Sequence, residues 1–254
     1  MVTPNRELAG QVALVTGGAL NIGRAICLDL AAAGAAVCVN AKSSKAGADA
    51  LVAEIEGQGG RAFAHMADVT DPDAVTTMVG EVVTQFGGLN ILINNASYRA
   101  RTPLVELSLE RWRLAQSVTV EGSYLCAQAA LPHITDRGAG TVINIGGVAA
   151  YIGVKDRLHA ATAKGAVSAM TRSLAQEVAG TGITVNCVVP GVIDTVRGAS
   201  AGQLPPGVDG DSNLIGRKGK PEEVAALVRA LCGLAGRYVT GQVIHCNGGM
   251  YLGA

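Results

Sequence analysis

A single lysine, Lys164, stands among small residues in the stretch RLHAATAKGAVSAM, residues 157–170. An ammonium group loses hydration in apolar surroundings, so a lysine placed there needs a partner or a chemical task. It can hold hydroxyl groups of a ligand or lower the pKa of an acidic neighbour. His159, in the same stretch, has a usual pKa that suits proton transfer near neutral pH. The stretch therefore directs attention to an enzyme site.

A glycine-rich turn in LVTGGALNIGRAI follows the first apolar run and opens a helical pattern. Because glycine lacks a side chain, the backbone N–H groups of such a turn can approach a pyrophosphate at the helix N-terminus. Glycine turns also occur for packing alone, but the order strand, turn, helix and second strand favours a nucleotide site. We expect four residues of the turn to contact the nucleotide: Gly17, Asn21, Ile22 and Gly23.

Short β-branched runs alternate with amphipathic stretches along the chain. The predicted strands cover residues 11–16, 35–40, 61–66, 89–94, 140–145, 183–188 and 242–246. The predicted helices cover residues 22–33, 44–57, 72–86, 107–135, 157–179 and 221–231. Since the strands lack polar alternation, we expect both of their faces to be buried in a parallel sheet. The order predicts an α/β fold with a single doubly wound, Rossmann-type sheet of seven parallel strands and helices on both faces.

The composition shows no break, so residues 1–254 are interpreted as one domain. One long segment, residues 191–216, has no helical or strand pattern. Long irregular loops of this kind often cover a site at the carboxyl ends of the strands. We predict that this segment is a substrate lid.

The charges are balanced, with 20 Lys and Arg against 20 Asp and Glu, so no global field attracts nucleic acid or a membrane. The first ten residues carry no signal-peptide core, and no apolar run is long enough to span a bilayer. The six cysteines are scattered, without a C-x-x-C pair. We expect a cytoplasmic protein with reduced cysteines that acts on a small molecule.

Six motifs occur in a fixed order along the chain: TGGALNIG, ADVTD, NNAS, VVPGVIDT, GRKGKPEEVA and TGQVIHCNGG. In that order the sequence resembles the short-chain dehydrogenase/reductase family over nearly its whole length. The resemblance implies a nicotinamide cofactor and assembly through the helices at 107–135 and 157–179. The further cofactor contacts that it implies are Asp68, Val69, Asn95, Ala96, Lys164, Pro190, Gly191 and Ile193.

The end of the second predicted strand indicates which nicotinamide cofactor is preferred. An NAD enzyme places Asp or Glu there to accept a hydrogen bond from the ribose, whereas this chain has Ala41, Lys42 and Ser43. No carboxylate repels a 2′-phosphate, and Lys42 can pair with one, so NADP(H) is favoured over NAD(H). Two alternatives stay open: Lys42 is an ordinary solvated lysine, or the chain binds no cofactor.

The resemblance also implies an Asn-Ser-Tyr-Lys set, in which the tyrosine is the acid or base and the lysine lowers its pKa. Here the four positions hold Thr119, Gly147, Ala160 and Lys164. Gly147 and Ala160 keep the family's separation of 13 residues, so an insertion does not explain the difference. Two further departures, at Asn21 and Ser97, add atoms where the family has glycine. The sequence therefore predicts an atypical member that lacks the catalytic serine and tyrosine, with Lys164 holding the ribose.

Three residues can replace the missing acid: His159, Tyr98 and Tyr151. On a regular helix His159 and Lys164 lie about 140° apart, so His159 reaches the site only where the helix begins irregularly. The tyrosines follow predicted strands at their carboxyl ends. For each residue the alternative is ordinary packing.

Arginine and lysine gather on the same two loops, at Arg99, Arg101, Lys155 and Arg157. They suit an anionic substrate such as a carboxylate or an acyl-CoA. The alternative is a solvated rim that is partly paired with Asp156. The remaining histidines show no metal-ligand spacing, so no metal site is predicted.

Two functions remain in view. The first is an NADP(H)-dependent oxidoreductase acting on a carbonyl or alcohol with a non-standard site. The second is an inactive subunit that assembles with an active relative. The first implies a homo-tetramer and the second a hetero-oligomer with a related subunit.

Overall fold

The computed structural model describes residues 6–134, 140–196 and 213–253. Seven parallel strands form one sheet in the order β3-β2-β1-β4-β5-β6-β7, as predicted. Their bounds are β1 (Val12–Val15), β2 (Ala36–Ala41), β3 (Arg61–Met66), β4 (Ile91–Asn94), β5 (Thr141–Ile145), β6 (Thr184–Pro190) and β7 (Val243–Cys246). Each predicted strand is found within two residues of its predicted ends.

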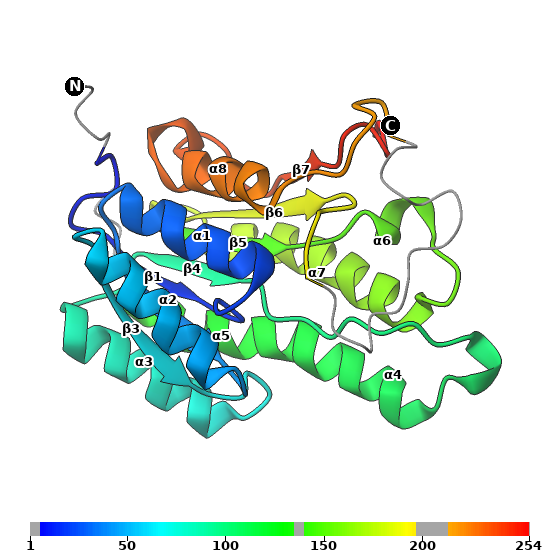
Figure 1. The fold of residues 1–254 in the computed structure, drawn as a ribbon, viewed down its shortest axis with the longest axis horizontal. Coiled ribbons are helices and arrows are strands. Elements are labelled where there is room, and N and C mark those ends of the chain that lie inside the picture. Colours follow the sequence, from blue (N-terminus) through cyan, green and yellow to red (C-terminus); the bar gives the residue numbers. More distant parts are fainter. Residues whose placement is uncertain (1–5, 135–139, 197–212, 254) are drawn as a thin grey trace.

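Helices cover both faces of the sheet (Figure 1). The α-helices are α1 (Asn21–Ala32), α2 (Lys45–Gly57), α3 (Pro72–Phe86), α4 (Leu109–Gln116), α5 (Gly122–Ala130), α6 (Ala149–Ile152), α7 (Leu158–Glu177) and α8 (Pro221–Cys232). Short 3-10 turns are η1 (Leu104–Glu106), η3 (Leu131–His133) and η5 (Leu234–Gly236). None of the described helices is both long and apolar enough to cross a membrane.

Three apolar clusters hold the helices to the sheet, two large ones on opposite faces and a small one that joins Val167 of α7 to β6. In β1, Ala13 and Val15 pack with residues of α1, α2 and α8, whereas Val12 and Leu14 pack with residues of α3, α5 and the end of α7. Successive side chains of a strand point to opposite faces, so one buried strand contributes to both cores. This explains the absence of polar alternation in the sequence.

One predicted helix was wrong in part. The pattern at 107–135 is not one α-helix, because a π-helical segment, η2 (Ser117–Glu121), separates α4 from α5. Such segments occur often at functional sites. The predicted loop before α7 contains the short helix α6, which the sequence did not indicate.

The chain order reverses between β1 and β4, since β2 and β3 lie on one side of β1 and the later strands on the other. Ligands of such sheets bind outside the carboxyl ends of the strands at this reversal. Of the predicted lid, the structure describes residues 191–196 and 213–216, and the rest lies outside the described residues.

Candidate functional site

A crevice of about 510 Å³ lies at the carboxyl ends of β1, β4, β5 and β6. Most of the predicted site residues meet there: Gly17, Asn21, Ile22, Gly23, Asn95, Ala96, Tyr98, Lys164, Pro190, Gly191 and Ile193. Others lie outside its lining: Lys42, Ser43, Asp68, Val69, Thr119, Tyr151 and His159. The predicted residues that line the crevice thus meet at the ends of four strands that are far apart in the sequence.

The glycine turn is fixed by the strand beside it. Asn95 Nδ2 donates to the carbonyl oxygens of Thr16 and Gly17, both at 2.9 Å. In return, Thr16 Oγ1 accepts from the backbone N–H groups of Asn95 at 3.0 Å and Ala96 at 3.1 Å. These bonds join the ends of β1 and β4 and hold the turn in one conformation.

Glycine is required at two positions of the turn by the space around it. Gly17 has φ +59°, in the left-handed region, and an added Cβ would lie 3.1 Å from Ala96 Cα. At Gly23 a Cβ would lie 2.6 Å from Asn95 Nδ2 and still closer to the carbonyl oxygen of Gly17. The turn can therefore pack against Asn95 and Ala96 in this conformation only because these side chains are missing.

The N-terminus of α1 suits a phosphate group. Its N-cap residue, Leu20, offers no side-chain acceptor, and its first turn contains no acidic residue. The first N–H groups of a helix have no intrahelical partner, and the helix dipole favours an anion there. Because Asn21, Ile22 and Gly23 also line the crevice, the residues present fit the pyrophosphate of a dinucleotide.

Asn21 takes a left-handed conformation, with φ +53°, which asparagine tolerates better than most residues. Its side chain does not fill the turn but bonds to the opposite wall. Asn21 Nδ2 donates to Val196 O at 3.1 Å, and Asn21 Oδ1 accepts from Val196 N at 2.9 Å. The nucleotide turn and the segment after β6 are thus joined across the crevice.

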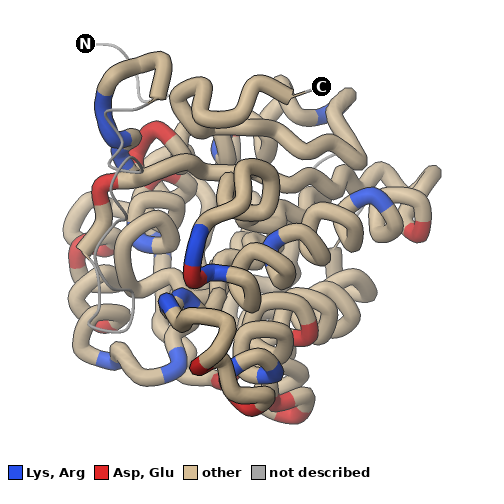
Figure 2. Tube along the Cα trace, turned by 90° about the vertical axis from the view of Figure 1, so that its right-hand side faces the viewer, with Lys and Arg blue, Asp and Glu red and all other residues tan. Residues whose placement is uncertain are grey.

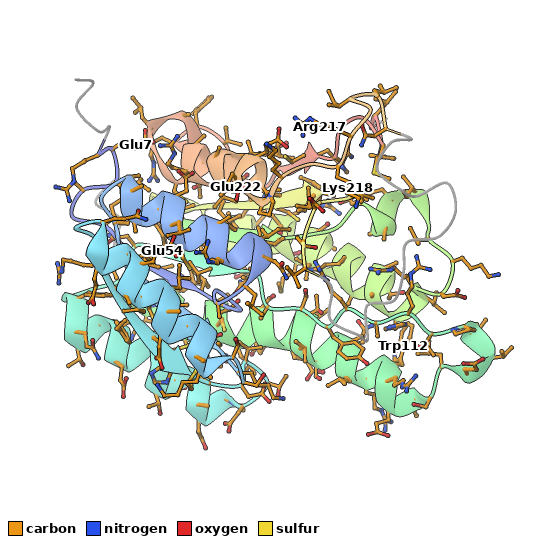
Figure 3. The ribbon with its side chains drawn as sticks, viewed as in Figure 1. Glu7, Glu54, Trp112, Arg217, Lys218 and Glu222 are labelled. Atoms are coloured by element: carbon orange, nitrogen blue, oxygen red, sulfur yellow. The ribbon has the colours of Figure 1, made fainter. Side chains whose placement is uncertain are left out.

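The segment after β6 is itself held by the segment before α8. The N–H of Gly219 donates to Val192 O at 3.0 Å, and the N–H of Asp194 donates to Gly219 O at 2.8 Å. Arg217 and Lys218 lie beside these bonds, above the end of β6 (Figure 3). Arg217 pairs with Glu223 of α8 at 2.6 Å. This wall of the crevice is therefore anchored by α8.

Lys42 and Asp68 form an ion pair, with 2.6 Å between Lys42 Nζ and Asp68 Oδ2. Burial opposes ionisation of Asp68, but hydrogen bonds from Lys42 and Thr70 outweigh it and lower its pKa. Lys42, the predicted partner of a 2′-phosphate, and Asp68, a predicted cofactor contact, thus meet at the ends of β2 and β3. Lys42 has a partner in this state, although its side chain is still 65% exposed.

Lys164 reaches the crevice from the second turn of α7. Its Nζ donates to the carbonyl oxygen of Ile145 at the end of β5. A Cβ on Gly147 would lie 3.4 Å from Lys164 Cγ, so the lysine stem runs beside Gly147. Burial lowers the pKa of Lys164 to about 8, the nearby Cys187 thiol acts in the opposite direction, and Arg99 lowers it further. Ala160, one turn earlier, lines the crevice next to this amine.

Tyr151 does not point into the crevice. Its hydroxyl donates to Ser168 Oγ at 2.8 Å, and Ser168 Oγ in turn donates to Lys164 O at 3.2 Å. Its ring contacts His245, with 4.6 Å between the ring centroids, and Tyr251, with 5.1 Å. Burial raises the pKa of Tyr151, and the bond to Ser168 opposes this shift.

His159 is fully buried in the first turn of α7. Neither ring nitrogen has a hydrogen-bond partner of good geometry among the described residues, although the backbone of Ala100 lies close enough to raise its pKa. Burial outweighs that effect and lowers the pKa of His159, with a further contribution from Arg157. The helix is regular at this point, so the ring lies off the crevice, as the helical geometry predicted.

Tyr98 is the predicted phenol that lines the crevice. Its N–H donates to Thr119 Oγ1 at 3.3 Å, and its ring lies 6.1 Å from that of His159. Thr119 is buried in the π-helical segment and contacts the backbone of Tyr98 rather than the crevice.

Arginine side chains line the same crevice as Tyr98. Arg99 and Arg101 come from the loop after β4, and Arg157 from the loop before α7, whereas Lys155 is exposed outside it. Figure 2 looks onto this side of the molecule and shows blue Lys and Arg segments near its centre. Among the described lining residues there is no aspartate or glutamate. No three His, Cys, Asp or Glu side chains of the described chain lie close enough together to hold a metal ion.

Comparison with known proteins decides the family. A family model described as "Enoyl-(Acyl carrier protein) reductase" matches residues 17–251. A 3-oxoacyl-[acyl-carrier-protein] reductase of Staphylococcus aureus is 36% identical over 249 residues, which cover 94% of this chain and 98% of that protein. A reductase of the same name from Synechocystis is 36% identical over 250 residues. The chain belongs to the short-chain dehydrogenase/reductase family.

Solved structures of short-chain dehydrogenases agree with this assignment. One from Burkholderia cenocepacia in complex with NADP has 37% sequence identity and a TM-score of 0.88, over 96% of this chain and 98% of that one. A blue fluorescent protein from a metagenomic library, in complex with NADPH, has 36% identity and a TM-score of 0.87, over the same shares of both chains. By its sequence the chain is a short-chain oxidoreductase close to the 3-oxoacyl reductases.

In this short-chain dehydrogenase/reductase, sequence reasoning missed residues that support the nucleotide turn. Asn40 is buried at the end of β2, where its Oδ1 accepts from the N–H of Gly17 at 3.2 Å and its Nδ2 donates to Ala67 O at 3.1 Å. The available signal was a polar residue at the carboxyl end of a buried strand. Nothing in the sequence indicated that Asn21 would form hydrogen bonds with Val196.

Proposed function

We propose that this chain is an NADP(H)-dependent oxidoreductase that interconverts a carbonyl and an alcohol without the family's usual serine and tyrosine. The observation that carries the proposal is the crevice itself. It joins a glycine turn and an uncapped helix N-terminus to the amine of Lys164. The first two features suit a dinucleotide, and the third suits proton transfer beside it.

The choice of NADP(H) rests on Lys42 and on the structural neighbours. Two solved relatives were obtained with NADP or NADPH. Lys42 lies at the end of β2, where a carboxylate would favour NAD. Lys42 must break its ion pair with Asp68 before it can pair with a 2′-phosphate. Since the lysine is mostly exposed, little burial opposes that exchange.

Two positions of the crevice carry no proton donor: Gly147 and Ala160. When bound, the reduced nicotinamide supplies a hydride to the carbonyl carbon. We infer that Lys164 Nζ supplies the proton to the carbonyl oxygen, so that the alcohol and a neutral amine result. A pKa of about 8 leaves the amine mostly protonated at neutral pH and able to give up that proton. Ile145 O fixes the amine while its other hydrogens remain for the substrate and the ribose.

The other candidate donors are less well placed. The hydroxyl of Tyr151 is engaged with Ser168, and the ring of His159 is enclosed in protein. Tyr98 lines the crevice and is the remaining alternative to Lys164. The relatives from Staphylococcus aureus and Synechocystis are named as 3-oxoacyl reductases, which supports a carbonyl as the reducible group.

A non-catalytic subunit is the second candidate function, because the side chains at Gly147 and Ala160 cannot move a proton. Exposed apolar residues on the segment from η1 to α5 suit assembly with a like or related subunit, among them Leu104, Val105, Leu109 and Tyr124. We propose a homo-tetramer for the enzyme and a hetero-oligomer for the inactive subunit. The inactive subunit would bind cofactor without turnover.

The test compares NADPH and NADH in binding and in turnover. Binding is followed by cofactor fluorescence and by quenching of Trp112, the single tryptophan, which lies on α4 (Figure 3). We expect NADPH to bind at least about tenfold more tightly than NADH, and Lys42→Ala to remove most of that difference. Absence of binding by both cofactors would overturn the proposal. Binding without reduction of any carbonyl in a broad panel would favour the inactive subunit.

A further inference from the structure

Arg101 carries a guanidinium group that is partly withdrawn from solvent. Its Nε and Nη2 are shielded from solvent and have no hydrogen-bond acceptor among the described residues. A guanidinium carries five N–H donors and is always charged, so unpaired burial of part of it is costly. Buried polar groups in folded proteins are normally paired, so an unpaired donor that lines a crevice is a group that a bound ligand can satisfy.

The surroundings of Arg101 add positive charge and no negative charge. Arg99, Arg157 and Lys164 line the same crevice. Asp156, which the sequence analysis considered as a partner for this rim, accepts a backbone bond from Thr102 N at 2.9 Å through its own carbonyl oxygen. The described salt bridges include none between Asp156 and these arginines. Arg99 and Arg157 have partners of their own, so Arg101 is the arginine of this crevice whose shielded donors are left for a ligand among the described residues.

The pyrophosphate of a dinucleotide does not account for Arg101. The residues that fit the pyrophosphate are in the glycine turn and α1, whereas Arg101 is in the loop after β4, which faces the loop before α7. The loop after β4 also holds Tyr98. Arg99, in the same loop, lies close enough to lower the pKa of Lys164. Arg101 is thus at the reacting end of the crevice.

We propose that Arg101 binds a carboxylate that the substrate carries a few bonds from its reacting carbonyl. The proposal rests on the proposed function and narrows its substrate class to oxo acids or hydroxy acids. Guanidinium and carboxylate match in geometry through paired N–H···O bonds. A phosphate at the far end of a long thioester arm does not suit this position, because two nitrogens of Arg101 are shielded from solvent in the crevice that Lys164 also lines. The chain thereby departs from the carrier-bound substrates that its relatives' names describe.

The experiment uses three compounds with the same 3-oxo group: acetoacetate, methyl acetoacetate and acetoacetyl-CoA. Their binding to the NADP⁺-saturated protein is measured by calorimetry, where no hydride is available for reduction, and their kcat/KM is measured with NADPH. We expect acetoacetate to bind about 10- to 100-fold more tightly than the ester, the range of a hydrogen-bonded charge pair. Arg101→Gln should remove that preference without changing the affinity for NADPH, and Arg101→Lys should retain part of it.

Lys155→Gln is the matched control, since it removes a cation from the adjacent loop that lies outside the crevice. It should leave the preference for acetoacetate unchanged. Equal binding of the acid and the ester, or an Arg101→Gln variant that keeps the preference, would overturn the inference while cofactor binding still supports the proposed function. A preference for acetoacetyl-CoA that depends on Arg101 would also overturn it. Failure of NADPH to bind the wild-type chain would instead remove the proposed function.

Discussion

The two ends of the crevice differ in how their polar groups are paired. At the nucleotide end, Thr16, Asn40 and Asn95 bond to the backbone around the glycine turn, and Asn21 bonds across to Val196. The turn is complete before any ligand arrives. Pre-formed hydrogen bonds of this kind reduce the ordering that binding requires.

At the reacting end, several buried polar atoms have no partner in the described chain. They are Nε and Nη2 of Arg101, Oγ1 of Thr102 and both ring nitrogens of His159. They lie where the loop after β4 meets the start of α7, but of these residues only Arg101 lines the crevice, and Thr102 and His159 are enclosed behind it. The comparison teaches that the nucleotide end of this short-chain dehydrogenase/reductase is pre-formed, whereas the other end leaves donors of Arg101 that a ligand or water can satisfy.

The largest expected effect follows removal of the amine at the reacting end. Lys164→Met should lower kcat for carbonyl reduction by about 10²–10⁴-fold, the usual contribution of a positioned acid. In the wild type, the ammonium form predominates below pH 8 and can donate a proton. The kcat for reduction should therefore fall as pH rises through about 8, and the rate of alcohol oxidation should rise over the same range.

Two variants sharpen that prediction. Lys164→Arg keeps a cation that does not titrate in this range, so any residual rate should lose the fall near pH 8. Tyr98→Phe should change kcat by less than about tenfold. A larger loss in the Tyr98 variant, with a small one in Lys164→Met, would transfer the role of proton donor to Tyr98.

A smaller effect is expected at the nucleotide end. Gly23→Ala places a Cβ against Asn95 Nδ2 and Gly17 O, so the turn must shift. We expect the free energy of unfolding to fall by about 1–3 kcal/mol, as for other overpacked sites. The affinity for NADPH should fall by at least about tenfold in a fluorescence titration.

Gly80→Ala is the control for the glycine change, because a Cβ at this position in α3 meets nothing within 4 Å. It should raise the free energy of unfolding by up to about 1 kcal/mol through helix propensity. It should leave NADPH affinity unchanged. Equal affinities in the Gly23 and Gly80 variants would mean that the turn does not hold the cofactor.

The smallest effect concerns His159. Its buried ring has unpaired nitrogens, so His159→Leu should raise the free energy of unfolding by about 1 kcal/mol and leave turnover unchanged. The lowered pKa of His159 in the native state decides how the stability of the wild type changes with pH. Below about pH 6.5 the unfolded chain binds a proton that the native ring resists, so the wild type loses stability as pH falls. Thermal unfolding from pH 7 to pH 5 should show a steeper loss for the wild type, and a drop in turnover in the variant would restore His159 as a candidate acid.

The fold could be predicted from the sequence because the two kinds of element look different in it. Buried parallel strands appear as short apolar runs without polar alternation, whereas amphipathic helices repeat their apolar residues with the helical period. The place of the glycine turn in the crevice could also be predicted, because turn residues act close to their own position in the chain, whereas their contacts with a nucleotide stay a prediction. The π-helical segment at Ser117–Glu121 could not be predicted, because its apolar spacing resembles that of an α-helix. The pairing of Lys42 with Asp68, the enclosure of His159 and the bond from Tyr151 to Ser168 depend on tertiary packing, which local patterns do not encode.

The central claim is that the cofactor site is intact and that proton transfer proceeds without the side chains usual at positions 147 and 160. Its most direct test is the double variant Gly147→Ser with Ala160→Tyr, in which kcat and the Kd for NADPH are measured together on one carbonyl substrate. The added serine carbon meets only ordinary contact with Lys164 Cγ, at 3.4 Å. We predict a Kd within about twofold of the wild type and a kcat that rises by about tenfold or more. An unchanged or lower kcat with NADPH bound would contradict the claim about the proton donor, and loss of NADPH binding by the wild type itself would contradict the claim about the cofactor site.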